Sequence, residues 1–487
     1  MSDLRLGKST LTGRRALALG AALGGVLLLL GGGTLLRPEP PAVNGNRAPL
    51  VGRTTTICTT SPPPKGEPAG KTEVSAVAVR EGSNRSGLLS GSTLSSKPAG
   101  LKITQQGKGA RLTGVNSPIV ISGEGAMATA SSAVIVSDVM DGQGAGLRAA
   151  PCLAPGTLQW FSGLGITDED RTDLILTNPD DSQAQVDLRI YGRSGRIPVP
   201  GSQGQVIRAH ESRSVSLNGL VKADGPLSVA VQATQGRVTA VAERSQSEQT
   251  RPAGVDWQIP SASPSPVVVI PGVPEDAGKR QLVVTNPGNS RASVGVQVLG
   301  FQGPYEPSGA GSLEVPPEST ATLSLEEGLA GTAASIKLTS DVPVTGAVIS
   351  SSRRGGAAPD LAIQSAAAPL IGTGVSAMGT SDTADSELIV SNAGDDDVQV
   401  TFEVLNHGGV TLRTGDLLLG ANSTATRRLN SPPPSYVVVK VPDGSSVVGG
   451  IVLTQPQRKV AGLATIPLES NLAGRATATR PDYSAGR

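Results

Sequence analysis

Hydrophobic and polar residues alternate along most of the chain in short runs. Clear examples are Val186-Leu188-Ile190, Val294-Val296-Val298 and Val400-Phe402-Val404. A period of two is typical of strands that bury one face, and the Gly, Pro, Asn and Asp residues between the runs are typical of turns. Helical periodicity is absent beyond the first 36 residues. The pattern therefore predicts an all-β protein.

Three short motifs recur at nearly constant spacing along the chain. They are Leu174-Ile-Leu-Thr-Asn178-Pro179, Leu282-Val-Val-Thr-Asn286-Pro287 and Leu388-Ile-Val-Ser-Asn392-Ala393, with the Asn residues 108 and 106 positions apart. An Asn-Pro pair ends a strand, because Pro cannot donate to the ladder and Asn bonds the backbone in a turn. Fixed offsets in three copies predict tandem immunoglobulin-like β-sandwich repeats, with these motif residues in a structural role.

One uncharged apolar segment, Ala16 to Leu36, follows Lys8, Arg14 and Arg15. About 21 helical residues suffice to cross a bilayer, and the positive charges before them favour a cytoplasmic N-terminus. We therefore predict a single-pass protein of the cell membrane, with the bulk of the chain on the extracytoplasmic side.

Other interpretations of this segment stay open. A cleaved signal peptide has a shorter apolar core and a small-x-small cleavage site, and the Arg14-Arg15 pair could belong to a twin-arginine export signal. Gly20 and Gly24 form a small-xxx-small pair that would allow two anchor helices to form a homodimer.

The domain organisation follows from the anchor and the repeat. We expect a cytoplasmic N-terminus (1–15), a transmembrane signal anchor (16–36), an extracytoplasmic stalk (37–56), a diverged first β unit (57–150), three β-sandwich units (151–256, 257–364 and 365–469) and a disordered tail (470–487).

Charge and cysteine content narrow the class of protein. The formal net charge is +1 and there is no basic stripe, so nucleic acid is a poor candidate partner. The two cysteines, Cys58 and Cys152, fit an oxidising exterior in which they form a disulfide, with two free buried thiols as the alternative.

Catalytic and metal-binding patterns are missing from the sequence. His210 and His407 occupy different positions of their repeats, and the acidic runs at 168–170 and 395–397 lack the spacing of a calcium loop. We therefore expect no catalytic residues, no metal and no cofactor.

Aromatic residues are scarce, and four of them are candidates for contact with a partner or ligand. Trp160 and Trp257 lie in the crossings between units, where they could seal a junction or form a ligand platform. Phe301 and Tyr305 lie in a loop after a strand, which is a common place for exposed contacts.

The chain resembles a family of uncharacterised membrane-anchored envelope proteins of high-GC Gram-positive bacteria, classed as a domain of unknown function. The resemblance rests on the N-terminal anchor, the Leu-x-[Leu/Val]-[Thr/Ser]-Asn-Pro strand ends, the Ala150-Pro-Cys152-Leu-Ala-Pro segment with Trp160 behind it, and Asp341-Val-Pro343-Val. It implies a role near a large membrane glycosyltransferase in envelope polysaccharide assembly. Asn392-Ala393 departs from the motif by losing the Pro.

Two hypotheses for function follow. The first is a non-catalytic, membrane-anchored scaffold or docking partner in the cell envelope, acting beside an envelope protein such as a membrane glycosyltransferase. The second is a carbohydrate-binding or carbohydrate-active module that contacts cell-wall glycan through a groove between units.

Overall fold

The structure is a computed structural model that describes residues 52–61, 70–80, 86–223, 225–275, 277–329, 331–352, 357–378, 384–429, 434–455 and 460–470. These residues lie in one compact unit, Val51–Arg475. They form an all-β structure, as the alternating pattern predicted, with a single short α-helix, α2 (Leu217–Leu220), among them. No described helix has the length and apolarity that a bilayer crossing needs. The predicted anchor (16–36) and nearly all of the predicted tail (470–487) lie outside the described residues.

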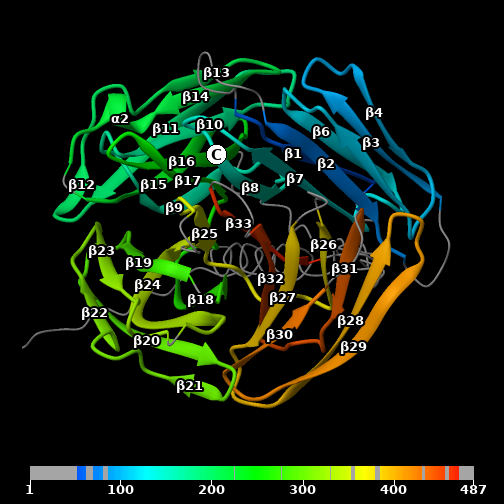
Figure 1. Ribbon diagram of the computed structural model, residues 1–487. Coiled ribbons are helices and arrows are strands. Elements are labelled where there is room, and N and C mark those ends of the chain that lie inside the picture. Colours follow the sequence, from blue (N-terminus) through cyan, green and yellow to red (C-terminus); the bar gives the residue numbers. More distant parts are fainter. Residues whose placement is uncertain are drawn as a thin grey trace, which may run out of the picture. The chain divides into compact units, whose positions relative to one another are not determined.

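The described strands form seven antiparallel sheets, which group into four successive two-layered units that we call sheet pairs 1 to 4 (Figure 1). In sheet pair 3 the two layers are joined into one eight-stranded sheet. Sheet pair 1 contains β1 (Arg53–Cys58), β2 (Lys71–Ala78), β3 (Gly87–Thr93), β4 (Pro98–Ile103), β5 (Gly109–Thr113), β6 (Ile119–Gly125), β7 (Ser131–Val139) and β8 (Gly146–Pro151). Its sheets have the orders β1-β6-β3-β4 and β5-β2-β7-β8. β1 begins inside the range expected to be a stalk (37–56), because Arg53–Cys58 pair with β6 over their whole length.

Sheet pair 2 encloses its own hydrophobic core. It contains β9 (Leu158–Leu164), β10 (Asp170–Thr177), β11 (Ala184–Gly192), β12 (Gly195–Ile197), β13 (Gln205–Ile207), β14 (Ser212–Ser216), β15 (Leu227–Gln235), β16 (Thr239–Glu248) and β17 (Arg251–Gln258). One sheet has the order β12-β11-β15-β9 with β13 also on β11, and the other has β14-β10-β16-β17. Leu174 and Leu176 of one sheet pack with Val186 and Leu188 of the other.

Sheet pair 3 repeats this arrangement with one change. It contains β18 (Ser265–Val273), β19 (Ala277–Asn286), β20 (Ala292–Gly300), β21 (Gly303–Tyr305), β22 (Ser312–Val315), β23 (Ser319–Ser324), β24 (Ala334–Ser352) and β25 (Leu361–Ser365). The long strand β24 serves both layers, since its first half pairs with β18 and β20 and its second half with β19 and β25.

Sheet pair 4 completes the described chain. It contains β26 (Thr373–Met378), β27 (Asp385–Asn392), β28 (Val398–Asn406), β29 (Thr411–Leu419), β30 (Ser423–Arg428), β31 (Ser435–Lys440), β32 (Val447–Gln455), β33 (Gly462–Pro467) and β34 (Glu469–Ser470). Its sheets have the orders β29-β28-β31-β26-β34 and β30-β27-β32-β33.

Each sheet pair contacts the next, and sheet pair 4 also contacts sheet pair 1. The β2 strand shows why: Val74 and Ala76 face the core of sheet pair 1, whereas Val77 packs into the core of sheet pair 4 with Phe402. One sheet of pair 1 is therefore buried on both faces. The last strands of the main sheets, β8, β17, β25 and β33, lie together where all four sheet pairs meet (Figure 1).

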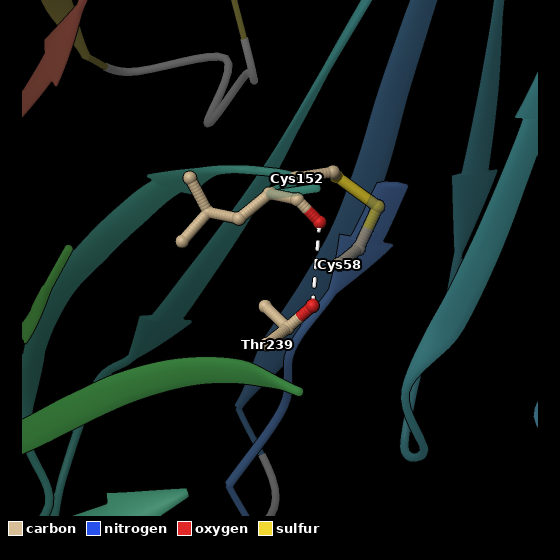
Figure 2. Close-up of a disulfide and its surroundings, with 4 residues drawn as sticks. Cys58, Cys152 and Thr239 are labelled. Carbon is tan, nitrogen blue, oxygen red and sulfur yellow. Dashed lines mark hydrogen bonds between the residues drawn. A yellow bond between two sulfur atoms is a disulfide. The ribbon is translucent and has the colours of Figure 1, made fainter. Parts of the chain in front are cut away.

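The predicted disulfide between Cys58 and Cys152 is present. Figure 2 shows it joining the end of β1 to the residue that follows β8. Beside it, Ile57 and Leu153 exchange two backbone hydrogen bonds of 2.8 and 3.0 Å, and the Thr239 hydroxyl of β16 donates to the Leu153 carbonyl at 3.5 Å. The bridge thus closes sheet pair 1 at its contact with sheet pair 2.

Replacing both cysteines by serine (C58S/C152S) should lower the free energy of unfolding by about 4 to 5 kcal/mol. The cause is the entropy of the released loop in the unfolded state, since the bridge spans 94 positions of sequence. Denaturant titration of wild type and variant, each with and without reductant, measures the loss. Reductant should shift only the wild type, and an equal shift in the variant would contradict this prediction.

Candidate functional site

The point where the four sheet pairs meet is organised around one buried carboxylate, that of Asp360. Its Oδ1 accepts the backbone N–H groups of Val255 at 3.1 Å and Leu361 at 2.9 Å. Its Oδ2 accepts those of Leu147 at 2.9 Å and Leu463 at 2.8 Å. Since these donors belong to β17, β25, β8 and β33, each sheet pair supplies one hydrogen bond to the same side chain.

Glycine allows the strands to approach Asp360 this closely. Gly146 and Gly254 have positive φ angles of 152° and 117°, and each directly precedes a donor residue. A Cβ on Gly146 would lie 2.6 Å from Oδ1 of Asp360, and one on Gly254 would lie 2.4 Å from the Leu361 nitrogen. Gly462 holds the corresponding place before Leu463. Sheet pairs 1, 2 and 4 thus have Gly at the position where sheet pair 3 has Asp360.

A second buried carboxylate, Asp256 on β17, reinforces the meeting point. It accepts the N–H groups of Trp257 and Ile363, both at 2.8 Å, and a backbone hydrogen bond from Ala149 of β8. Both Asp256 and Asp360 are fully buried.

Burial shifts the acidity of both carboxyl groups. Desolvation raises the pKa of Asp360 to about 7, although its four backbone donors oppose the rise. Desolvation also raises the pKa of Asp256 well above its usual value, with a further contribution from the charge of Asp360. These two groups therefore bind protons more tightly in the folded protein than in the unfolded chain.

Trp257 lies in the junction between sheet pairs 1 and 2. Its ring is 3% exposed, and its Nε1 donates to Glu243 at 2.9 Å. The same carboxylate accepts Nη1 of Arg148 at 2.8 Å, and the guanidinium group lies 5.8 Å from the centre of the Trp257 ring. The side chain thus lies buried in this junction, with its Nε1 already bonded to Glu243.

The other three aromatic candidates do not join Trp257 in one surface. Trp160 on β9 is buried and packs against Tyr191 with ring centres 5.8 Å apart. Phe301, between β20 and β21, is 77% exposed, and Tyr305 on β21 is 36% exposed. The candidates are therefore split between two buried junction residues and one exposed hairpin.

The side chains of the three motif Asn residues hold their turns with the same kind of hydrogen bonds to the backbone. Asn178 donates through Nδ2 to three carbonyl groups at 2.8 to 3.1 Å, and its Oδ1 accepts an N–H two residues ahead at 3.0 Å. Asn286 makes the same four bonds, and Asn392 makes three of them. All three side chains are fully buried. Pro179 and Pro287 follow at half-buried positions.

The hydroxyl residue before each later motif Asn joins neighbouring sheet pairs. Thr285 hydrogen bonds with Ser162 and Ser228 of sheet pair 2, both at 2.6 Å. Ser391 bonds Ser335 of sheet pair 3 at 2.7 Å in the corresponding place. The same polar contact thus recurs at two successive junctions.

Sheet pair 4 meets sheet pair 1 partly through His407. Its Nε2 lies 3.0 Å from the Ser75 hydroxyl, and its carbonyl accepts the Gly109 N–H at 2.9 Å. Desolvation lowers the pKa of His407 to about 4, so the ring is neutral at physiological pH. This histidine is part of an inter-sheet contact.

A polar cleft of about 750 Å³ lies between sheet pairs 2 and 3. Near its floor, the Arg244 guanidinium is bound in bidentate fashion by Asp170, at 2.5 and 2.7 Å. Lys279, Glu248 and Glu326 also line it. Among the described residues, no group of three or more His, Cys, Asp or Glu side chains could hold a metal ion.

The buried Asp360 centre was not among the residues predicted from the sequence, although the sequence contains a signal for it. The segments Gly146-Leu-Arg, Gly254-Val-Asp, Asp360-Leu-Ala and Gly462-Leu-Ala lie in or directly before four strands, β8, β17, β25 and β33, that occupy corresponding places. Aligning these segments would have marked Asp360 as the exception.

Asn286→Ala should lower the free energy of unfolding by roughly 2 to 4 kcal/mol. The change removes the donor to the buried carbonyl groups of Val315 and Pro316 and leaves them without that partner. Chemical denaturation measures the loss. Asn289→Ala, an exposed site three residues on, is the matched control and should stay within about 0.5 kcal/mol of wild type. Equal effects of the two changes would contradict a stabilising role for the hydrogen bonds of the Asn286 side chain.

Asp360→Asn should destabilise the protein and change its dependence on pH. Two N–H groups would face an amide NH₂ in place of an oxygen, a loss of roughly 2 to 5 kcal/mol. Because the folded-state pKa of Asp360 is raised, its contribution to stability falls as pH rises from about 4 to about 7 and is constant above that.

Denaturant titrations between pH 4 and 8 test this prediction. The difference in unfolding free energy between wild type and Asp360→Asn should change with pH only below about 7. Asp168→Asn, at an exposed position, serves as the control and should follow wild type at every pH. A difference between wild type and Asp360→Asn that does not vary with pH would contradict titration of Asp360.

Comparison with known proteins places the chain in a family. No curated protein matches it significantly. The profile of a family of unknown function, DUF5719, matches residues 104–430, which is more than half of the chain. The match confirms the resemblance at the level of a domain of unknown function. The chain therefore belongs to DUF5719, a family of unknown function.

Proposed function

We propose that this protein is a non-catalytic, membrane-anchored component of the cell envelope that docks onto another envelope protein. The observation that carries the proposal is the Asp360 centre, where one carboxylate binds a backbone N–H group from each of four sheet pairs. Such an arrangement holds the sheet pairs as one body with fixed outer surfaces, which suits a docking role.

The membrane part of the proposal rests on the sequence. The apolar segment 16–36 with its preceding positive charges supports a single-pass anchor, with the sheet pairs on the extracytoplasmic side. The disulfide between Cys58 and Cys152 agrees with an oxidising compartment. We also infer that each sheet pair is an immunoglobulin-like sandwich, since each has two antiparallel layers over a shared core.

A membrane glycosyltransferase is the partner that we favour, on the strength of the family resemblance. The exposed hairpin between β20 and β21 is the first candidate contact, because Phe301 projects from it with 77% of its surface exposed. Exposed aromatic residues are frequent anchors of protein interfaces.

Crosslinking of the full-length protein in native membranes, followed by mass spectrometry, tests the proposal. We expect crosslinks to a membrane protein, and loss of its co-purification once a protease site introduced after Leu50 is cleaved. Phe301→Ala should weaken the association by about tenfold without changing the melting temperature, whereas Val206→Ala, an exposed apolar site on sheet pair 2, should leave it unchanged. Crosslinks to polysaccharide alone would contradict docking onto a protein.

A carbohydrate-binding module is the second candidate function. The polar cleft between sheet pairs 2 and 3 favours it, because about 750 Å³ is within the range of small-molecule sites. In this case the full chain should bind purified wall glycan, and Lys279→Ala, at the rim of the cleft, should weaken binding. Trp257→Ala is unsuitable as a test, since loss of that buried ring would lower the melting temperature.

A further inference from the structure

The outer edge strand of sheet pair 4 differs from the corresponding edges of sheet pairs 2 and 3. In sheet pair 2 the edge consists of two three-residue strands, β12 and β13, separated by residues 198–204 with two prolines. In sheet pair 3 it consists of the short strands β21 and β22. In sheet pair 4, β29 runs for nine residues along β28.

The β29 edge is unpaired and exposes several apolar side chains. Within the described residues, β28 is the one strand that pairs with β29. Leu418 is 73% exposed, Leu412 is 38% exposed, and Val410, just before the strand, is 58% exposed. Proteins usually interrupt or charge such edges, because the free N–H and C=O groups of an edge strand can pair with another strand.

The order of residues along β29 suits a second copy of the same strand. Antiparallel pairing about Gly415 would place Leu412 of each copy opposite Leu418 of the other, and Thr414 opposite Asp416. A shift of two residues in either direction would lose this match, because it would set a leucine against Asp416 or Thr414. Side chains directly opposite one another are the main source of stability in paired strands.

Charge and local geometry are compatible with self-pairing. The strand carries one cation, Arg413, and one anion, Asp416, so two copies would not repel each other. A β-bulge lies at Leu412, where Arg413 and Thr411 pair with consecutive residues of β28. Pairing of two copies would therefore be centred on the regular stretch around Gly415, and the two Leu412–Leu418 contacts would lie at its ends, beside the bulges.

We propose that the protein forms a two-fold symmetric homodimer through antiparallel pairing of β29 with the β29 strand of a second copy. The pairing joins the two five-stranded sheets that contain β29 into one continuous sheet across the dimer axis. Both copies use the same surface, as a two-fold interface requires. This inference is independent of the proposed docking role and of any contact between anchor helices.

Thiol crosslinking of full-length protein in mild detergent tests both the dimer and its register. The native cysteines are bonded to each other, so an introduced cysteine supplies the reactive thiol. A mixture of the Thr414→Cys and Asp416→Cys proteins should form a disulfide-linked dimer under mild oxidation, because these positions face each other in the proposed pairing. Each variant alone should crosslink poorly, and equal crosslinking of all three samples would overturn the register and the proposal.

Light scattering provides the second measurement. Leu418→Lys should raise the dimer dissociation constant by about tenfold or more, because each dimer loses two buried leucines. Val206→Lys, at an exposed valine on the corresponding edge of sheet pair 2, is the matched control and should leave the dimer intact. A monomeric wild type, or a dimer that Leu418→Lys does not weaken, would overturn the proposal.

Discussion

The described structure depends on the hydrogen bonds between the Asp360 carboxylate and four backbone N–H groups. Where strands of several sheets meet in the interior, their backbone N–H and C=O groups need hydrogen-bond partners. A buried N–H group without a partner lowers the stability of the fold by about 1 to 3 kcal/mol. Here four strands meet at one point, and one side chain satisfies a donor from each. Gly146 provides the space that the side chain occupies, and Gly254 leaves room for the backbone between Asp360 and Leu361.

Apolar contacts between neighbouring sheet pairs add to the hydrogen bonds of the Asp360 carboxylate. The core of sheet pair 4 includes Val77, Val134 and Leu147 from sheet pair 1, so the first and last parts of the described chain are buried together. On the other side of sheet pair 1, Trp257 of sheet pair 2 packs into its core, beside the Arg148–Glu243 ion pair. The sheet pairs are therefore more closely integrated than domains joined by linkers, whose interfaces are smaller and more polar.

The sequence predicted local structure well and long-range contacts poorly. Alternation identified strands such as β11, in which Val186, Leu188 and Ile190 are buried in turn. The two cysteines were correctly paired, since an oxidised pair was the simplest use of a count of two. Asp360 was missed because a single aspartate at the start of a strand has the pattern of a turn residue. Its donors are backbone groups up to about 200 residues away, and backbone groups leave no mark in a sequence.

The number of lone pairs on a carboxylate limits how many modules can share the Asp360 centre. Two carboxylate oxygens offer about four acceptor positions, and the four N–H groups around Asp360 occupy all of them. Open solenoids gain and lose copies readily because each module touches only its neighbours. In this chain a duplicated fifth module would bring a donor with no acceptor, and a deleted one would leave an acceptor with no donor. The Asp360 carboxylate thus accommodates the four sheet pairs that supply its donors and has no acceptor position for a fifth.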